Sequence, residues 1–469
     1  MLMTFAEAAA LPFFKILPSE DETPAYRGFD SVCADSREAA PGALFFALPG
    51  ERSDGHAFVR DAFRAGAAGA VVDVSKTGVF AVAEAVDEAV RRRGTRPVLL
   101  EARTGIGQLA LLQALAAAYI DRFPSLLRIG ITGSSGKTTT KELTAAMIGA
   151  ERSVAFNSGN LNSDSGLPLS LFRVRAEHRI GVFEMGMNRK GEIAELAAVL
   201  RPQIALVTNT GSAHIGLIGS ERGIALEKKS VFSRFTGKEL AILPESGPFA
   251  EFLAEGVNGR LVRFGRTASK KFGGAESKGL YGSVIVWNGV KADFALPGGH
   301  NLLNALAAAA VAEAAGASDE AVRTGLASAK PLFGRGEIVS ILDGDVTVVR
   351  DCYNANPDSM EQAVSLCDEA DWNGRRLYVI GSMLELGGDS ERAHGALGER
   401  LAASKADAVF LFGEETKVSC EKLRNAKGKF AFHTNDIDEL KSKLTGCVKK
   451  GDMILLKGSR SCALERVLP

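Results

Sequence analysis

The sequence predicts an α/β protein with three domains, and three observations support that prediction. The chain has 469 residues, which corresponds to about three domains at roughly 150 residues each. Short apolar segments alternate with helical segments, as in parallel sheets that are covered on both faces. A Gly/Ser-rich loop joins one apolar segment to a helix. We place the domains at residues 1–103, 104–316 and 317–469.

The first domain is predicted to be small and α/β. Segments 43–48 and 70–74 are rich in β-forming residues and lie among turn residues. Helical periodicity, with many Ala and Leu residues, then begins near residue 106 and continues to 119, which indicates the first helix of the second domain.

The second domain alternates short apolar strands with helices. Segments 127–131, 180–183 and 204–208 are short, mostly apolar segments without polar–apolar alternation, each followed by a turn that contains glycine. This pattern predicts a buried parallel sheet. Residues 301–315 predict a closing helix, and we expect an exposed loop around 270–278.

The third domain returns to the same alternation over about 150 residues, the usual size of a doubly wound domain. Its predicted strands are 346–350, 376–380, 408–412 and 453–456.

The composition excludes several classes of protein. Lys+Arg and Asp+Glu both total 56, so there is none of the basic excess typical of a duplex-binding protein. The six cysteines are scattered, without C-x-x-C pairs or zinc-ligand spacing, as in proteins of a reducing compartment. Residues 1–10 are apolar but short, with Glu7 and no leading Lys or Arg, which does not fit a signal peptide. No apolar stretch reaches the ~18 residues of a membrane span. We expect a cytoplasmic monomer that binds small molecules.

Residues 129–140 carry the strongest chemical signal, Ile-Gly-Ile-Thr-Gly-Ser-Ser-Gly-Lys-Thr-Thr-Thr. Successive backbone N–H groups of such a loop, together with a helix N-terminus, cradle nucleotide phosphates. Lys137 is expected to reach the β- and γ-phosphates, and Thr138 to hold Mg²⁺. Ile131 replaces the first glycine of the strict phosphate-loop pattern. The alternative is a glycine-rich turn with a chance lysine.

Two polar residues follow other predicted strands. Glu184 ends the strand at 180–183, and His214 lies shortly after the strand at 204–208. Carboxyl ends of parallel strands face the ligand crevice, and a carboxylate is a hard oxygen ligand for a metal. Taken alone, Glu184 fits a solvated carboxylate and His214 fits a hydrogen-bonded loop histidine.

In order along the chain, these segments resemble the Mur ligases, which form an amide bond through an acyl phosphate. The similar segments are 132–143, 159–171, 184–193, 208–232, 297–310, 351–360, 379–387 and 455–468. In the first domain, Asp35-Ser36-Arg37 and residues 41–48 look like the family's uridine-nucleotide-binding domain. The resemblance implies a central parallel-sheet, P-loop-type ATP-binding domain and a Rossmann-like C-terminal domain.

The resemblance also implies the reaction. Segments 351–360 and 457–461 are similar to the branch that joins D-alanyl-D-alanine to UDP-N-acetylmuramoyl-tripeptide, with ATP and Mg²⁺ as cofactors. The C-terminal domain would admit the dipeptide. Because ATP contacts would come from two domains, we also expect domain closure.

Residue roles implied by the resemblance fall into four groups. Those near the ATP phosphates are Gly133, Ser134, Ser135, Gly136, Lys137, Thr138, Thr139 and Asn160. Those near the adenine or closing over ATP are His300, Asn301, Arg335 and Asp351. Thr138 and Glu184 would hold one Mg²⁺, and His214 a second. Substrate contacts are expected from Ser36, Arg37, Tyr353, Asn354 and Asn356.

Lys228 aligns with a family lysine that is carbamylated by CO₂ and reaches toward magnesium. The amine must be neutral to react, and a free lysine has a pKa of ~10.4, so the resemblance implies a desolvated site. The local sequence Glu-Lys-Lys at 227–229 by itself favours a solvated helix face.

The chain departs from the family pattern at three places. Arg350-Asp351-Cys352 stands where two aspartates are common, Ser382 where an aspartate is common, and Gly216 where a glutamate is common. Two other functions remain open from the sequence: an amide ligase that adds a single amino acid, and a nucleotide-dependent switch or motor.

Overall fold

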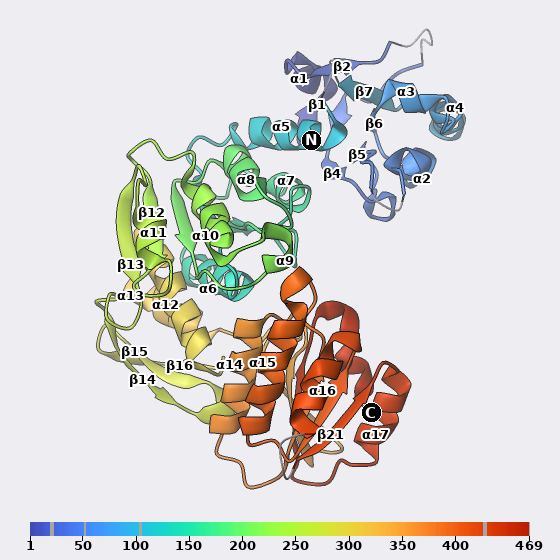
Figure 1. Ribbon diagram of the computed structural model, residues 1–469. Helices are drawn as coiled ribbons and strands as arrows, with labels where there is room; N and C mark the ends of the chain where they lie inside the picture. Colours follow the sequence, from blue (N-terminus) through green and yellow to red (C-terminus); the bar gives the residue numbers. More distant parts are fainter. Residues whose placement is uncertain (19–22, 51–52, 103–105, 425–428, 469) are drawn as a thin grey trace. The chain divides into compact units, whose positions relative to one another are not determined.

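The computed structural model describes residues 1–18, 23–50, 53–102, 106–424 and 429–468. The chain divides into two compact units, Met1–Leu126 with Asn157–His178, and Leu127–Phe156 with Arg179–Pro469. The α/β class predicted from the sequence is confirmed (Figure 1). The predicted boundary at 103/104 lies outside the described residues, and the boundary at 316/317 stays a prediction.

The first unit contains a five-stranded sheet in the order β2-β7-β6-β5-β4, with β2 antiparallel and the other strands parallel. Its strands are β2 (Phe14–Ile16), β4 (Ser31–Cys33), β5 (Ala43–Phe46), β6 (Gly69–Val72) and β7 (Val98–Ala102). A two-stranded pair is formed by β1 (Met3–Thr4) and β3 (Gly28–Phe29). The strands predicted at 43–48 and 70–74 are confirmed as β5 and β6.

Helices of the first unit bury apolar stripes against this sheet. Phe45, Val72 and Val86 are fully or almost fully buried in one cluster. The helices are α1 (Phe5–Ala10), α2 (Val59–Ala65), α3 (Val74–Thr77), α4 (Val82–Arg93), α5 (Gln108–Ile120) and α7 (Gly166–Leu171). The helix predicted at 106–119 is confirmed as α5. It packs beside α7, and its Tyr119 hydroxyl donates to the Val174 carbonyl at 2.7 Å.

The second unit begins with a six-stranded, wholly parallel sheet in the order β13-β12-β11-β8-β10-β9. Its strands are β8 (Leu127–Thr132), β9 (Val154–Phe156), β10 (Ile180–Glu184), β11 (Ile204–Val207), β12 (Leu240–Pro244) and β13 (Arg260–Phe264). The three strands predicted here are confirmed. Since β8 lies between β10 and β11, the loops that follow these three strands meet at one edge.

Helices of the second unit cover this sheet. They are α6 (Lys137–Gly149), α8 (Glu192–Leu200), α9 (Ile215–Ile218), α10 (Glu221–Lys229), α11 (Ala250–Ala254), α12 (Gly299–Ala314) and α13 (Asp319–Ala327). The predicted helix at 301–315 is confirmed as α12. It packs against α6, and both contribute to a core that includes Ile129, Met147, Leu306 and Val311.

The prediction of an exposed loop around 270–278 is wrong. Most of it forms β14 (Phe272–Ser277), which pairs antiparallel with β15 (Ser283–Trp287), and β15 in turn pairs with β16 (Val290–Phe294). The strand has one exposed edge and an irregular register at Gly273 and Gly274. Lysines and glycines suit such an edge, so the composition alone resembled a loop.

The C-terminal sheet has the order β17-β18-β22-β19-β20-β21, and only the β17–β18 pair is antiparallel. Its strands are β17 (Glu337–Ile341), β18 (Val346–Asp351), β19 (Arg376–Gly381), β20 (Ala408–Phe412), β21 (Phe430–Thr434) and β22 (Met453–Lys457). The helices are α14 (Pro357–Glu369), α15 (Ser390–Ala403), α16 (Lys417–Arg424) and α17 (Ile437–Thr445), and Figure 1 shows α14, α15 and α16 side by side. All four predicted strands are confirmed.

Within the described ranges, no helix is long and apolar enough to cross a membrane. The six cysteines are unpaired, and five are buried. Burial raises the pKa of the Cys33 thiol to about 12 and that of Cys352 to about 11, so these side chains act as small apolar groups.

Candidate functional site

The loop between β8 and α6 has the backbone that a phosphate cradle requires. Gly133 has φ of 149° and Gly136 has φ of 78°, and both values are strained for residues with a side chain. A Cβ at Gly133 would collide with the Thr208 hydroxyl, and one at Gly136 would collide with the Asn304 side-chain oxygen. The glycines are therefore needed for both backbone conformation and space.

Two residues that follow the neighbouring strand β11, Thr208 and Asn209, hold this loop in place through hydrogen bonds, and we call this pair the clamp. The Thr208 hydroxyl donates to the Ser135 carbonyl at 2.7 Å, and the Asn209 side chain bonds both the N–H and the carbonyl of Ser135 at 3.0 Å. The Ser134 N–H donates to the Asn209 carbonyl at 3.1 Å. Sequence reasoning missed this clamp. Its signal was the polar pair Thr208-Asn209 at the end of a strand predicted in the same sheet.

Lys137 begins α6 and folds back over the loop. Its ammonium donates to the Gly133 carbonyl at 2.8 Å and to the Ser134 carbonyl at 3.3 Å. Burial lowers the pKa of Lys137, and the nearby positive charge of Arg335 acts in the same direction. Arg335, which was expected to close over ATP, therefore lies near Lys137, and both residues belong to the second unit.

Thr138 and Glu184 lie together beneath the loop. The Thr138 hydroxyl donates to a Glu184 carboxylate oxygen at 2.8 Å, and both side chains are buried. Glu184 is therefore not a solvated carboxylate. Hydroxyl and carboxylate oxygens are the ligands that Mg²⁺ prefers, so this pair fits a magnesium ion.

Lys228 is fully buried on α10, and the structure gives its ammonium no hydrogen-bond partner. Burial lowers its pKa well below the usual value, and the positive charge of Lys137 adds to that effect. Its acidic neighbour Glu227 instead accepts from the backbone N–H groups of Gly191 and Ile193 at 2.8 and 2.9 Å. The structure thus rules out a solvated helix face at Lys228.

Lys229, the next residue, differs from Lys228. It is not buried, its ammonium donates to the Phe252 carbonyl at 2.6 Å, and it lies 4.5 Å from the centre of the Phe252 ring. The two adjacent lysines on one helix therefore differ in burial and in hydrogen bonding, which the sequence Glu-Lys-Lys did not reveal.

His300 and Asp351 approach one another near the start of α12. Burial lowers the pKa of His300, and the Asp351 charge opposes that effect. Asp351 also pairs with buried Lys457 at 2.9 Å, and Lys457 donates to the Asn354 carbonyl at 2.8 Å. Asn301, in the first turn of α12, donates its side-chain amide to the Pro297 carbonyl at 2.8 Å. The sequence motif at 457–461 gave Lys457 no role, and the structure shows that its ammonium bridges Asp351 and the Asn354 carbonyl.

The residues expected near the dipeptide divide into two kinds. The guanidinium of Arg335 lies over the Tyr353 ring, with its central carbon 4.3 Å from the ring centre. Asn354 is exposed. Asn356 caps α14 by accepting from the Ser359 N–H at 2.8 Å, and its amide donates to the Ser135 hydroxyl at 3.3 Å. Asn356 therefore touches the phosphate loop, while the dipeptide roles stay predictions.

His214 is held by the C-terminal sheet's loops. Its Nδ1 lies 2.7 Å from a carboxylate oxygen of Glu385, and the Gly216 N–H donates to the Glu385 carbonyl at 3.1 Å. The glycine at 216, noted above as a departure, thus lies against Glu385. The sequence could not indicate this pairing, because the two residues are far apart along the chain.

In the first unit, Ser36 and Arg37 lie in a short 3₁₀ turn, Ser36–Glu38. Asp35 accepts from the Arg37 N–H at 2.9 Å and pairs with its guanidinium, which holds the pKa of Asp35 at about 2. The Arg37 side chain is 88% exposed. Asn160 is also exposed, in the turn between β9 and α7. It belongs to the first unit and the phosphate loop to the second, so its role stays a prediction.

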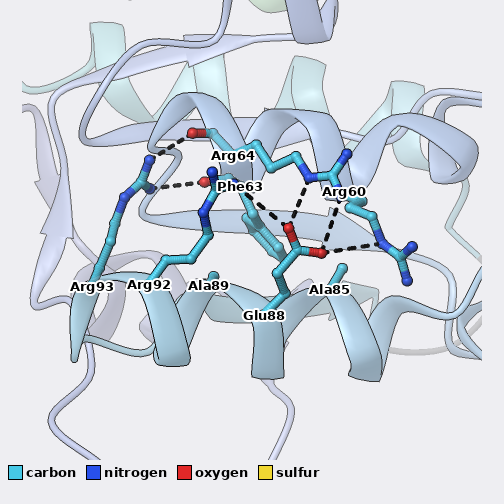
Figure 2. Close-up of a pocket in the computed structure, with 8 residues that line it drawn as sticks. All are labelled: Arg60, Phe63, Arg64, Ala85, Glu88, Ala89, Arg92 and Arg93. Carbon is cyan, nitrogen blue, oxygen red and sulfur yellow. Dashed lines mark hydrogen bonds and ion pairs between the residues drawn. The ribbon is translucent and has the colours of Figure 1, made fainter.

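A pocket between α2 and α4 includes none of the predicted residues. Figure 2 shows Glu88 at its centre, paired with Arg60, Arg64 and Arg92, while Arg93 donates to the Phe63 and Arg64 carbonyls. These arginines are already engaged within the unit. Their arrangement indicates ion pairs and hydrogen bonds that hold α2 against α4, and not a ligand-binding site.

Comparisons with known proteins agree with this geometry. Residues 131–312 match the Mur ligase middle domain, 334–460 match the Mur ligase, glutamate ligase domain, and 29–118 match the Mur ligase family, catalytic domain. The three matches confirm the three-domain organisation, with boundaries that differ in detail from the compact units.

Two curated relatives share most of their length with this chain. One is the UDP-N-acetylmuramoyl-tripeptide–D-alanyl-D-alanine ligase of Treponema pallidum, 40% identical over 94% of each chain. Another, with the same name, is from Escherichia coli and is 34% identical over 94% of this chain and 93% of its own.

Solved structures resemble the whole fold. MurF from Acinetobacter baumannii superposes with a TM-score of 0.80 at 28% identity, covering 93% of this chain and 92% of that one. MurF ligase from Thermotoga maritima in complex with ADP gives a TM-score of 0.75 at 27% identity, covering 93% and 96%.

Proposed function

The chain belongs to the Mur ligase family, and we propose its reaction on that basis. It is an ATP-dependent ligase that joins D-alanyl-D-alanine to UDP-N-acetylmuramoyl-tripeptide, a step of peptidoglycan precursor synthesis. We propose further that it acts in the cytoplasm as a monomer. The observation that carries the proposal is one group of side chains at one edge of a parallel sheet: the partly buried Lys137 and the buried Thr138, Glu184 and Lys228.

The chemistry divides into two steps. The terminal carboxylate of the tripeptide attacks the γ-phosphate of ATP, which gives an acyl phosphate and ADP. The amine of D-alanyl-D-alanine then attacks the acyl carbonyl, phosphate leaves, and the amine loses a proton as the amide forms. Hydrolysis of the acyl phosphate would waste ATP, so the site must exclude water.

The phosphate loop supplies positioning and charge. Gly133 and Gly136 let the backbone approach the phosphates, and the start of α6 points its N–H groups at them. Lys137 exchanges its loop carbonyl partners for phosphate oxygens. Its ammonium then offsets the negative charge on the transferred group, where such preorganised charges are most effective.

Magnesium fits the oxygen pair of Thr138 and Glu184, and when bound it would neutralise phosphate charge. His214, at the edge of the same loop cluster, is proposed to serve a second ion. Asp351, His300 and Asn301 are proposed to contact the nucleotide, and Tyr353 and Asn354 the dipeptide. In the first unit, Ser36 and Arg37 are proposed to contact the uridine nucleotide.

Lys228 has the environment that carbamylation requires. A neutral amine adds to CO₂ and releases a proton, and the burial that lowers the pKa of Lys228 favours the neutral amine. The resulting carbamate would carry a negative charge close to the positive charge of Lys137. The missing partner of the Lys228 ammonium supports this proposal.

Phosphate release with each co-substrate omitted in turn tests the function. We expect release only when ATP, UDP-tripeptide and D-alanyl-D-alanine are all present, and no amide product when D-glutamate replaces the dipeptide. Release of phosphate from ATP alone would instead identify a switch or motor. Efficient use of a single amino acid would identify a different amide ligase.

A further inference from the structure

The loop that follows β22 places an arginine at the same sheet edge as the segment expected to meet the dipeptide. β18 and β22 are parallel neighbours whose last residues, Asp351 and Lys457, lie opposite one another. The loops after these strands therefore meet at one edge, and open parallel sheets bind ligands at that edge. Lys457 ties the two loops together through Asp351 and the Asn354 carbonyl. Arg460, which begins a 3₁₀ turn shortly after Lys457, lies at this edge too.

Glu465 holds the guanidinium of Arg460 by only one of its edges. The two terminal nitrogens of Arg460 donate to the two carboxylate oxygens of Glu465 at 2.9 and 2.7 Å. Among the described residues, Nε of Arg460 has no hydrogen-bond partner, and the side chain is 49% exposed. Arginine carries five N–H donors in a planar fork, so the edge formed by Nε and one terminal nitrogen remains open. Such an edge can pair with a second carboxylate through two parallel hydrogen bonds.

An exposed phenylalanine lies next to Arg460. Phe333 is 45% exposed, and the central guanidinium carbons of Arg460 and Arg350 lie 5.8 and 4.6 Å from its ring centre. Arg350 differs from Arg460, because its Nε and one terminal nitrogen already donate to Glu337 at 2.9 and 2.7 Å. Of these two arginines, only Arg460 therefore has an open edge for a carboxylate, and Phe333 offers an apolar surface beside it.

The opposite end of the site sets the direction in which the dipeptide must lie. Its amine must reach the acyl carbonyl beside the phosphate loop, and Arg335 lies near the lysine of that loop and over the Tyr353 ring. Cys352, which precedes Tyr353, donates its thiol at 3.7 Å to Glu465, the carboxylate that holds Arg460. Tyr353 thus connects the phosphate end to the Arg460 end. An extended dipeptide spans about 7 Å, which suits a path along this residue.

We propose that Arg460 binds the free carboxylate of the incoming D-alanyl-D-alanine, with Phe333 against the terminal methyl group, and thereby selects an acceptor that ends in a carboxylate. The inference rests on the proposed function and deepens it, since it names the group that is recognised at the end of the dipeptide away from the new bond. Arg460 does not touch the reacting atoms, so its role is specificity.

Steady-state ligation with D-alanyl-D-alanine and with its C-terminal amide tests the inference. Arg460→Gln should raise KM for the dipeptide about tenfold or more with kcat nearly unchanged, because one charge-assisted pair is lost. In the unmodified chain the amide should show a similar rise in KM, and Arg460→Gln should raise it no further. An unchanged KM for the dipeptide in Arg460→Gln, or equal losses with both acceptors, would overturn the inference.

Two further variants separate recognition from simple stabilisation of the turn. Glu465→Gln removes the ion pair but keeps the arginine charge, so the preference for the dipeptide over its amide should persist. Arg466→Gln changes an exposed arginine of the next 3₁₀ turn, Leu464–Val467, and is the matched control that should leave both KM values unchanged. If Glu465→Gln abolished the preference as completely as Arg460→Gln does, only the integrity of the turn would matter and the inference would fail.

Arg335→Gln distinguishes the two ends of the dipeptide. Because Arg335 lies at the phosphate end, its loss should lower kcat with both acceptors alike and leave the ratio of their KM values unchanged. Loss of the preference in Arg335→Gln but not in Arg460→Gln would place the carboxylate at Arg335 and contradict the inference. If the unmodified chain ligates neither acceptor, the proposed function fails, whereas equal use of both acceptors would remove the inference alone.

Discussion

The phosphate-loop edge of the central sheet and the Asp35–Arg37 turn of the first unit were both predicted to bind nucleotides, yet they differ in structure. At the loop, Thr138, Glu184 and Lys228 are buried, and Thr208 and Asn209 fix the backbone. At the turn, Arg37 is exposed and its main partner is its neighbour Asp35. A group that catalyses must be preorganised away from water, whereas a group that only binds can remain on the surface.

Lys137→Ala should produce the largest loss. The transferred phosphate would lose its fixed positive charge, and removal of one such contact typically lowers kcat by ~10²–10³. The measurement is steady-state ligation, with circular dichroism to confirm folding. A near-normal kcat would remove the loop from the proposed mechanism.

Lys228→Ala should come next, with kcat lowered on the order of 10² because the carbamate that we propose to reach toward magnesium is lost. Acetate, which supplies a carboxylate, should restore part of the activity. Lys229→Ala is the matched control, since it changes the adjacent lysine that is not buried, and it should keep normal kcat. Equal effects of the two substitutions would show that burial does not distinguish these lysines.

Asn209→Ala should have a moderate effect. It leaves the N–H of the partly buried Ser135 without its partner, and an unsatisfied group costs up to about 1–3 kcal/mol when it is fully buried. We expect KM for ATP to rise about tenfold while KM for D-alanyl-D-alanine stays constant. Isothermal titration with ADP would check the loss, and unchanged ADP affinity would mean that the clamp is not needed for phosphate binding.

Asp35→Asn should have the smallest effect. Its partner Arg37 lowers the Asp35 pKa to about 2, below the ~3.9 of an unfolded aspartate. The charged pair therefore stabilises the fold above about pH 4, and that contribution is lost as the pH falls through about 2. The urea midpoints of the two proteins should differ slightly at pH 6 and converge toward pH 2. A difference that grows on acidification would contradict this sign.

Local sequence was sufficient for strands and for the phosphate loop, because apolar runs and glycine spacing depend on short-range physics. β8, β10 and β11, with Lys137 and Thr138 after the first of them, follow from that pattern. The burial of Lys228 and the contact of Glu385 with His214 arise only from packing between distant segments. The edge strand β14 was missed because exposed edges carry the same residues as loops.

The acyl phosphate is the central claim, and an isotope experiment tests it most directly. The terminal carboxylate of the UDP-tripeptide would be labelled with ¹⁸O, and the phosphate released during ligation would be analysed by mass spectrometry. If the carboxylate attacks the γ-phosphate, one ¹⁸O should appear in phosphate for each amide bond formed. Unlabelled phosphate accompanying normal amide formation would contradict the mechanism.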